Sequence, residues 1–169
     1  MARRVFFSFH YKRDIGRIGQ IRNSWVVRSP IETAGFVDSA EWESIERQGD
    51  PAIQRWINSQ LHGTSVTVVL IGAETYKRRW VKYEIEKTHN DGKGLLGIKV
   101  HNVKDFRTQA TDVAGLNPLD QIKTSGGSLF SQLYPTYDWA INNGRENIEQ
   151  WIEKAIQDAQ QKKSSYNRF

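Results

Sequence analysis

The sequence predicts an α/β protein with a flavodoxin-like arrangement, a central parallel sheet of about five strands with helices on both faces. Two observations support this fold class. Residues 66–72 (VTVVLIG) and 95–100 (LLGIKV) are almost continuously apolar, as expected of strands that are covered on both faces. Segments with helical spacing of apolar residues lie between the strand-like runs, and such alternation is typical of a parallel sheet.

Three further runs complete the predicted sheet. Residues 4–9 (RVFFSF) are aromatic and β-branched, which favours a strand. Residues 35–38 (GFVD) are a shorter candidate. Residues 133–137 include Pro135, which cannot donate a hydrogen bond to a neighbouring strand, so we place this run at an edge of the sheet.

Four helices are predicted between and after these strands. The first has apolar residues at helical spacing from Ile15 to Trp25, with Asp14 as its N-cap. The second starts at Asp50-Pro51, with Asp50 as the cap, and ends before Gly63. The third spans residues 76–90, and the last has an apolar stripe from residue 148 to 159 and finishes in Lys162-Lys163.

The domain organisation is simple. The sequence has no internal repeat or interdomain linker, so residues 1–163 are expected to form a single domain, with residues 164–169 as a frayed tail. Residues 101–133 have no strong periodicity, and they are too long for a simple connection. We therefore expect them to be either partly helical or a functional loop.

Composition excludes several protein classes. The 169 residues contain no cysteine, so disulfides, zinc–thiolate sites and thiol nucleophiles are ruled out. There is neither a signal peptide nor an apolar run of the roughly 18 residues that a membrane helix needs, and a cytoplasmic location fits best. The net charge of +5 favours solubility over nucleic-acid binding, because the basic clusters at residues 77–79 and 162–163 are short.

Candidate site residues follow the predicted strands, because ligands of open parallel sheets bind beyond the carboxyl ends of the strands. On the third predicted helix, Trp80 and Glu84 lie four positions apart, which places an aromatic ring and a carboxylate side by side on one face. The resulting candidates include His10, Tyr11, Asp38, Trp42, Gly72, Trp80 and Glu84. Taken singly, each candidate has an ordinary structural explanation: Trp80 can belong to the core, and Glu84 can be a solvated side chain. Ser8, at the end of the first strand, can simply hydrogen-bond to the backbone.

Several familiar sites are missing from the sequence. It lacks the P-loop pattern, the glycine-rich fingerprint of dinucleotide-binding folds and the nucleophile elbow of hydrolases. Its four histidines share no metal-ligand spacing. We therefore expect neither a metal nor a bound cofactor.

Several motifs resemble those of TIR domains. Residues 4–11 (RVFFSFHY) resemble the first TIR box, and residues 68–84 (VVLIGAETYKRRWVKYE) resemble the third strand and following helix, including the WxxxE pattern of NAD-cleaving members. More narrowly, VFFSFHY, IRNSW, RRWVKYEI, NPLD and YDW together resemble the TIR subunit of bacterial Thoeris anti-phage defence systems. The resemblance covers roughly the first 140 residues.

The resemblance implies a TIR fold and an enzyme that cleaves NAD at the nicotinamide–ribose bond, with NAD as substrate rather than cofactor. The product would be a cyclic ADP-ribose isomer that activates a separate effector protein. Glu84 would be catalytic, and Phe9, His10 and Tyr11 would lie in the loop that closes over the nicotinamide side of the substrate. Residues 38–42 would begin the loop used for assembly and substrate access, although no Arg-Asp…Pro-Gly box is present there.

The resemblance also implies self-association through TIR surfaces and a phage-derived trigger. A second hypothesis is a non-catalytic TIR scaffold that binds other TIR domains or a phage component. The two hypotheses differ in their need for the carboxylate of Glu84. A fixed carboxylate can bind the ribose diol and stabilise positive charge as the nicotinamide bond breaks.

Overall fold

The computed structural model describes residues 4–26, 32–34 and 39–166. Its sheet has five parallel strands in the order β2-β1-β3-β4-β5, the order of flavodoxin-like folds. This confirms the predicted fold class. The strands are β1 (Arg4–Ser8), β2 (Glu32–Ala34), β3 (Val66–Ile71), β4 (Gly94–Lys99) and β5 (Thr136–Asp138).

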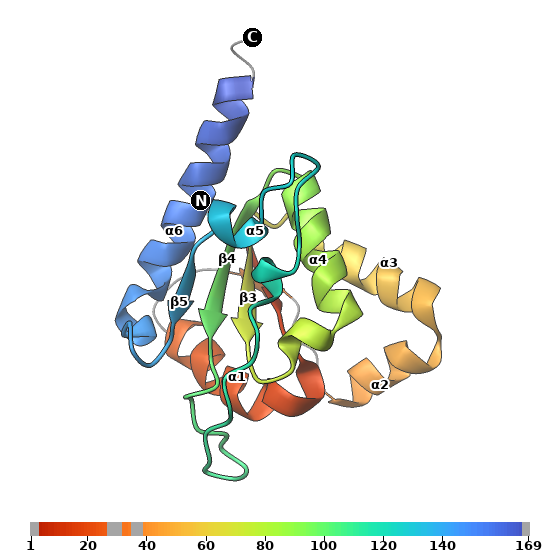
Figure 1. Ribbon diagram of the computed structural model, residues 1–169. Helices are drawn as coiled ribbons and strands as arrows, with labels where there is room; N and C mark the ends of the chain where they lie inside the picture. Colours follow the sequence, from red (N-terminus) through yellow and green to blue (C-terminus); the bar gives the residue numbers. More distant parts are fainter. Residues whose placement is uncertain (1–3, 27–31, 35–38, 167–169) are drawn as a thin grey trace.

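Helices cover both faces of the sheet (Figure 1). Helices α1 (Tyr11–Val26) and α6 (Gly144–Tyr166) pack on one face, where their isoleucines meet alternate residues of β1, β3 and β4. Helices α3 (Asp50–Leu61) and α4 (Arg79–Asn90) cover the other face. All six residues of β3 are buried, which explains why its sequence has no polar face.

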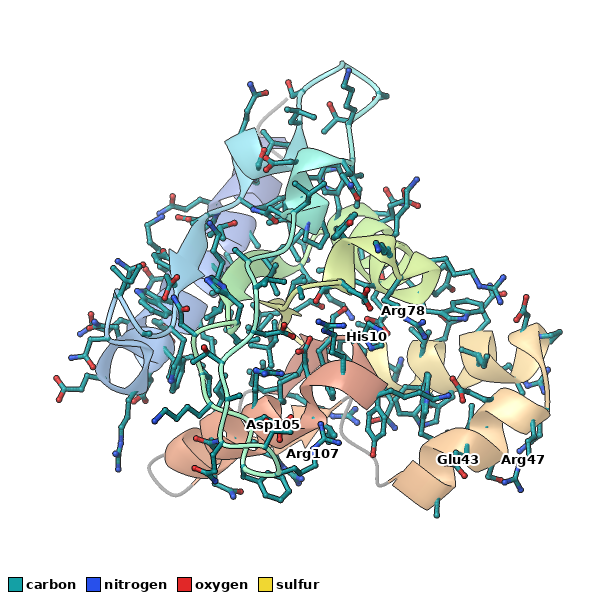
Figure 2. All side chains as sticks on the ribbon, turned by 60° about the horizontal axis from the view of Figure 1, so that its bottom comes forward. His10, Glu43, Arg47, Arg78, Asp105 and Arg107 are labelled. Carbon is teal, nitrogen blue, oxygen red and sulfur yellow. The ribbon has the colours of Figure 1, made fainter. Side chains whose placement is uncertain are left out.

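The remaining elements are short. Helix α2 (Ser39–Arg47) lies beside α3, with Trp42 and Ile45 packed inward and the Glu43–Arg47 ion pair facing outward at 3.6 Å (Figure 2). Two 3-10 turns, η1 (Thr75–Lys77) and η2 (Pro118–Asp120), and the short helix α5 (Phe130–Leu133) complete the elements of the described residues. The segment from 101 to 133 is therefore partly helical, one of the two outcomes that we expected.

The first helix and the second strand correct the sequence analysis. Helix α1 begins at Tyr11, and the backbone N–H of Asp14 donates to the carbonyl of His10 at 3.0 Å, so Asp14 is not the N-cap. The prediction was late because the apolar periodicity starts only at Ile15. The strand expected at residues 35–38 lies outside the described residues, and the strand that pairs with β1 is Glu32–Ala34.

The later boundaries also shift. Gly49, with φ of 89°, is the N-cap of α3, so Asp50 is the first helical residue, and Pro51 lies in the first turn. The third predicted helix starts at Arg79 rather than residue 76 because η1 comes first. Strand β5 is an edge strand as expected, but it begins after Pro135. Helix α6 continues to Tyr166, past the tail boundary expected at 164.

No helix among the described residues has the length and apolar character needed to span a membrane.

Candidate active site

Glu84 lies on the buried face of α4 and reaches the carboxyl end of β1. Val81, Ile85 and Thr88 share this face and hold the helix on the sheet, where the Thr88 and Thr67 hydroxyls are 2.6 Å apart. Glu84 itself is only 7% exposed. Its Oε2 accepts a hydrogen bond from the Oγ of Ser8, the last residue of β1.

The surroundings of Glu84 favour a protonated carboxyl group. Burial raises the pKa of Glu84 to about 8, and the hydrogen bond from Ser8 opposes that rise only in part. No cation among the described residues forms an ion pair with this carboxylate. A strongly perturbed carboxyl at the carboxyl edge of a parallel sheet is typical of a functional site.

Aromatic side chains enclose the space around Glu84. Tyr11 at the start of α1 stacks on Trp42 of α2, with ring centroids 5.9 Å apart, and Trp42 meets the edge of Trp56 on α3 at 5.5 Å. The pocket has a volume of about 40 Å³, the space of only a few water molecules. It is lined by Phe6, Phe7, Phe9, Tyr11, Trp42, Trp56, Arg78, Trp80, Val81 and Glu84.

The structure brings five of the eight predicted site residues together. Phe9, Tyr11, Trp42 and Trp80 all line the pocket that contains Glu84. Two details differ from the sequence analysis, because Tyr11 is the first residue of a helix and Trp42 lies on a helix rather than in a loop. Trp80 is half-buried and packs against the edge of Tyr83 at 5.6 Å.

Three predicted residues lie elsewhere. Asp38 is outside the described residues. Gly72 is buried away from the pocket, where a Cβ would collide with the carboxylate of Asp14. His10 does not line the pocket but lies beside Arg78 (Figure 2), and burial, followed by the charge of Arg78, lowers its pKa.

The sequence analysis missed Ser8, Trp56 and Arg78 as parts of this site. Ser8 was interpreted as a partner of backbone, yet its hydroxyl binds Glu84. A signal was present, because a serine inside the apolar run RVFFSF is unusual for a fully buried strand. No local pattern points to Trp56 or Arg78, which join the site through packing of α3 and η1.

A buried ion network fixes the start of α1 beside the pocket. Arg17 lies within 3.5–3.9 Å of the carboxylates of Asp14, Asp105 and Asp112. Arg13 binds Asp112 through two hydrogen bonds of 2.8 and 3.0 Å. This network ties the segment after β4 to the helix that carries Tyr11.

Asp14 is the least satisfied member of the network. Its Oδ2 has no hydrogen-bond partner among the described residues, and burial raises its pKa to about 6. The described residues contain no group of three or more His, Asp or Glu side chains placed to hold a metal ion.

The residues of this site lie within a segment that matches a known protein family. Residues 6–105, which include Ser8, Tyr11 and Glu84, match the model of the family described as "Thoeris protein ThsB, TIR-like domain". The chain belongs to the Thoeris ThsB TIR-like family. This ThsB-family chain is also 41% identical over 140 residues to a Bacillus cereus (strain MSX-D12) protein named "Putative cyclic ADP-D-ribose synthase ThsB1". The match covers 82% of the chain and 72% of that relative.

Proposed function

We propose that this ThsB-family chain is an enzyme that cleaves NAD at the nicotinamide–ribose bond and converts the remainder into a cyclic ADP-ribose-type nucleotide. The observation that carries the proposal is the buried Glu84 carboxyl, hydrogen-bonded to Ser8 inside an aromatic pocket. The name of the Bacillus cereus relative supports the same product class.

The reaction requires charge stabilisation more than proton transfer. As the bond between ribose and nicotinamide breaks, its electron pair goes to the ring nitrogen, nicotinamide leaves as a neutral molecule, and positive charge develops on the ribose. An ionised Glu84 can bind the ribose hydroxyls and stabilise this charge. Aromatic neighbours can stack on the pyridinium of the substrate, worth roughly 0.5–2 kcal/mol.

Substrate charge would also prepare Glu84 for this role. The carboxyl is mostly protonated at neutral pH while the pocket is closed, because burial holds its pKa at about 8. A cationic pyridinium beside it would lower that pKa and favour the ionised form. A nucleophilic group of the same substrate then captures the ribose and loses a proton. A dry site favours this cyclisation over attack by water.

The closed pocket supports a need for activation. A volume of about 40 Å³ is too small for nicotinamide and ribose, so the Tyr11–Trp42 stack has to separate before substrate enters. Because α2 carries Trp42, movement of this short helix would widen the pocket. We propose that a phage-derived trigger or self-association through TIR surfaces causes this movement, and that the nucleotide activates a separate effector in the cytoplasm as an antiviral defence.

Replacing Glu84 with glutamine tests the proposal. Mass spectrometry would follow nicotinamide release and nucleotide products in phage-infected cells that express either form. We expect Glu84→Gln to lose both products, while the matched variant Glu86→Gln, on the exposed side of the same helix, keeps them. Product formation and phage protection by Glu84→Gln at wild-type levels would instead support a non-catalytic TIR scaffold.

A further inference from the structure

A second cavity lies at the edge of the sheet opposite Glu84. Figure 1 shows α5 and the end of α4 gathered beside α6, at the amino ends of β3 and β4. The cavity has a volume of about 560 Å³, within the range of small-molecule sites. Its lining comes from the end of α4, the start of β4, the segment 124–135 and one face of α6.

Lysine side chains dominate the charge of this cavity. Lys93, Lys162 and Lys163 line it, and none forms an ion pair with a carboxylate among the described residues. The one acidic lining residue, Asp158, is already bound to Lys154 at 2.6 Å. Burial lowers the pKa of Lys93, and the charge of Lys163 lowers it further while Asp91 opposes the shift, so a bound anion would relieve the repulsion between these two ammonium groups.

Hydrogen bonds hold Lys93 in position, whereas Lys162 and Lys163 are exposed side chains that contact the wall of the cavity. The ammonium group of Lys93 donates to the carbonyl of Leu61 at 2.6 Å and to Thr64 Oγ1 at 3.2 Å. Lys162 lies over the ring of Tyr134, with its nitrogen 4.7 Å from the centroid. Lys163 crosses Gly92, where a Cβ would lie only 2.8 Å from its Cε.

Neutral polar groups complete the lining. Tyr134 and His89 share a hydrogen bond of 2.5 Å, and burial, together with the charge of Lys162, lowers the pKa of His89. Hydroxyl groups of Thr124, Ser125 and Ser128 come from the turn opposite α6. Hydroxyls and ammonium groups around one concavity are common phosphate-binding groups.

We propose that this cavity binds a phosphate-bearing small molecule of nucleotide size, with Lys162 and Lys163 as its phosphate ligands and Lys93 adding positive charge to the wall. A concavity of this size favours a small molecule over nucleic acid, which requires an extended basic stripe. This site is separate from the Glu84 pocket. Helix α4 links the two, because its middle carries Glu84 and its last turn contributes His89 and Asn90 to the cavity.

Isothermal titration calorimetry on the full chain tests this assignment. ATP and inorganic pyrophosphate are titrated into Glu84→Gln, which retains the second cavity even if the NAD-cleavage proposal fails. We expect each probe to bind with a dissociation constant below about 1 mM. The dissociation constant should rise at least about tenfold in the double variant Lys162→Ala/Lys163→Ala. Lys104→Ala, at an exposed position outside the cavity, should bind as the parent does. Binding of both probes would show that phosphates suffice, and binding of ATP alone would show that the nucleoside also contributes.

A chemical footprint provides a second measurement that needs no variant. We expect ATP or pyrophosphate to protect Lys162 and Lys163 from acetylation, read by mass spectrometry, while Lys154 keeps its reactivity. The proposal is overturned if neither probe binds at about 1 mM, or if binding is unchanged in the double lysine variant. Equal acetylation of all three lysines with and without the probes would also overturn it.

Discussion

Replacing Glu84 with glutamine is expected to stabilise the protein at alkaline pH although it removes product formation. The pKa of Glu84 is about 8 in the folded protein, against an ordinary value of 4.5. Between these values the folded protein binds more protons than the unfolded chain, so its stability falls as pH rises. Glutamine keeps the shape of the side chain and can hydrogen-bond Ser8, but it has no charge to bury.

The size of the effect follows from the shift in pKa. At about 1.4 kcal/mol per pH unit, the interval from 4.5 to about 8 is worth at most about 5 kcal/mol. We therefore expect the two proteins to have similar free energies of unfolding near pH 4.5. By pH 8 the Glu84→Gln protein should be more stable by about 4 kcal/mol.

Urea denaturation at a series of pH values would measure this difference. Asp14 also has a raised pKa, about 6, but it is present in both proteins and cancels in the comparison. Glu86→Gln is the matched control, because the Glu86 side chain is 46% exposed and its Oε1 lies 3.8 Å from the Nζ of Lys82. Parallel stability curves for wild type and Glu84→Gln between pH 5 and 8 would refute the argument from burial.

Four further substitutions probe the site and its support. Trp80→Ala should lower both the melting temperature and the activity, with a loss of about 3 kcal/mol in the free energy of unfolding. An unchanged melting temperature would contradict the packing role of Trp80. Tyr11→Ala should reduce nucleotide formation and leave the circular dichroism spectrum intact, whereas His10→Gln should retain substantial turnover, with KM affected more than kcat. A His10→Gln enzyme that binds NAD normally without turnover would show a catalytic role for the imidazole. Arg17→Met should lower the free energy of unfolding, measured by urea denaturation, by about 3–5 kcal/mol, because three buried carboxylates lose their shared cation. An unchanged urea midpoint would contradict a stabilising role for Arg17.

Part of this protein could be predicted because its signals are local. The apolar runs of β3 and β4 identified buried parallel strands, since both faces of such strands are covered. Trp80 and Glu84 lie four positions apart on one helix, so their proximity needed no knowledge of the fold. Helix α2 was missed because it has only nine residues and a single short apolar face.

The pairing of Ser8 with Glu84 needed the tertiary structure. These residues are 76 positions apart, and they meet only because β1 lies next to β3 while α4 packs across the same face. The aromatic enclosure likewise joins residues of α1, α2 and α3. No spacing in the sequence encodes such contacts.

The sequence alone therefore determined the fold class, the family resemblance and Glu84 as the candidate catalytic residue, because periodicity and motifs are properties of neighbouring residues. Tertiary structure decided the environment of Glu84, from its hydrogen bond with Ser8 to the burial that raises its pKa. It also brought Lys93 together with Lys162 and Lys163 around one cavity. Burial and electrostatic coupling depend on distances through space, and packing of the helices on the sheet sets those distances.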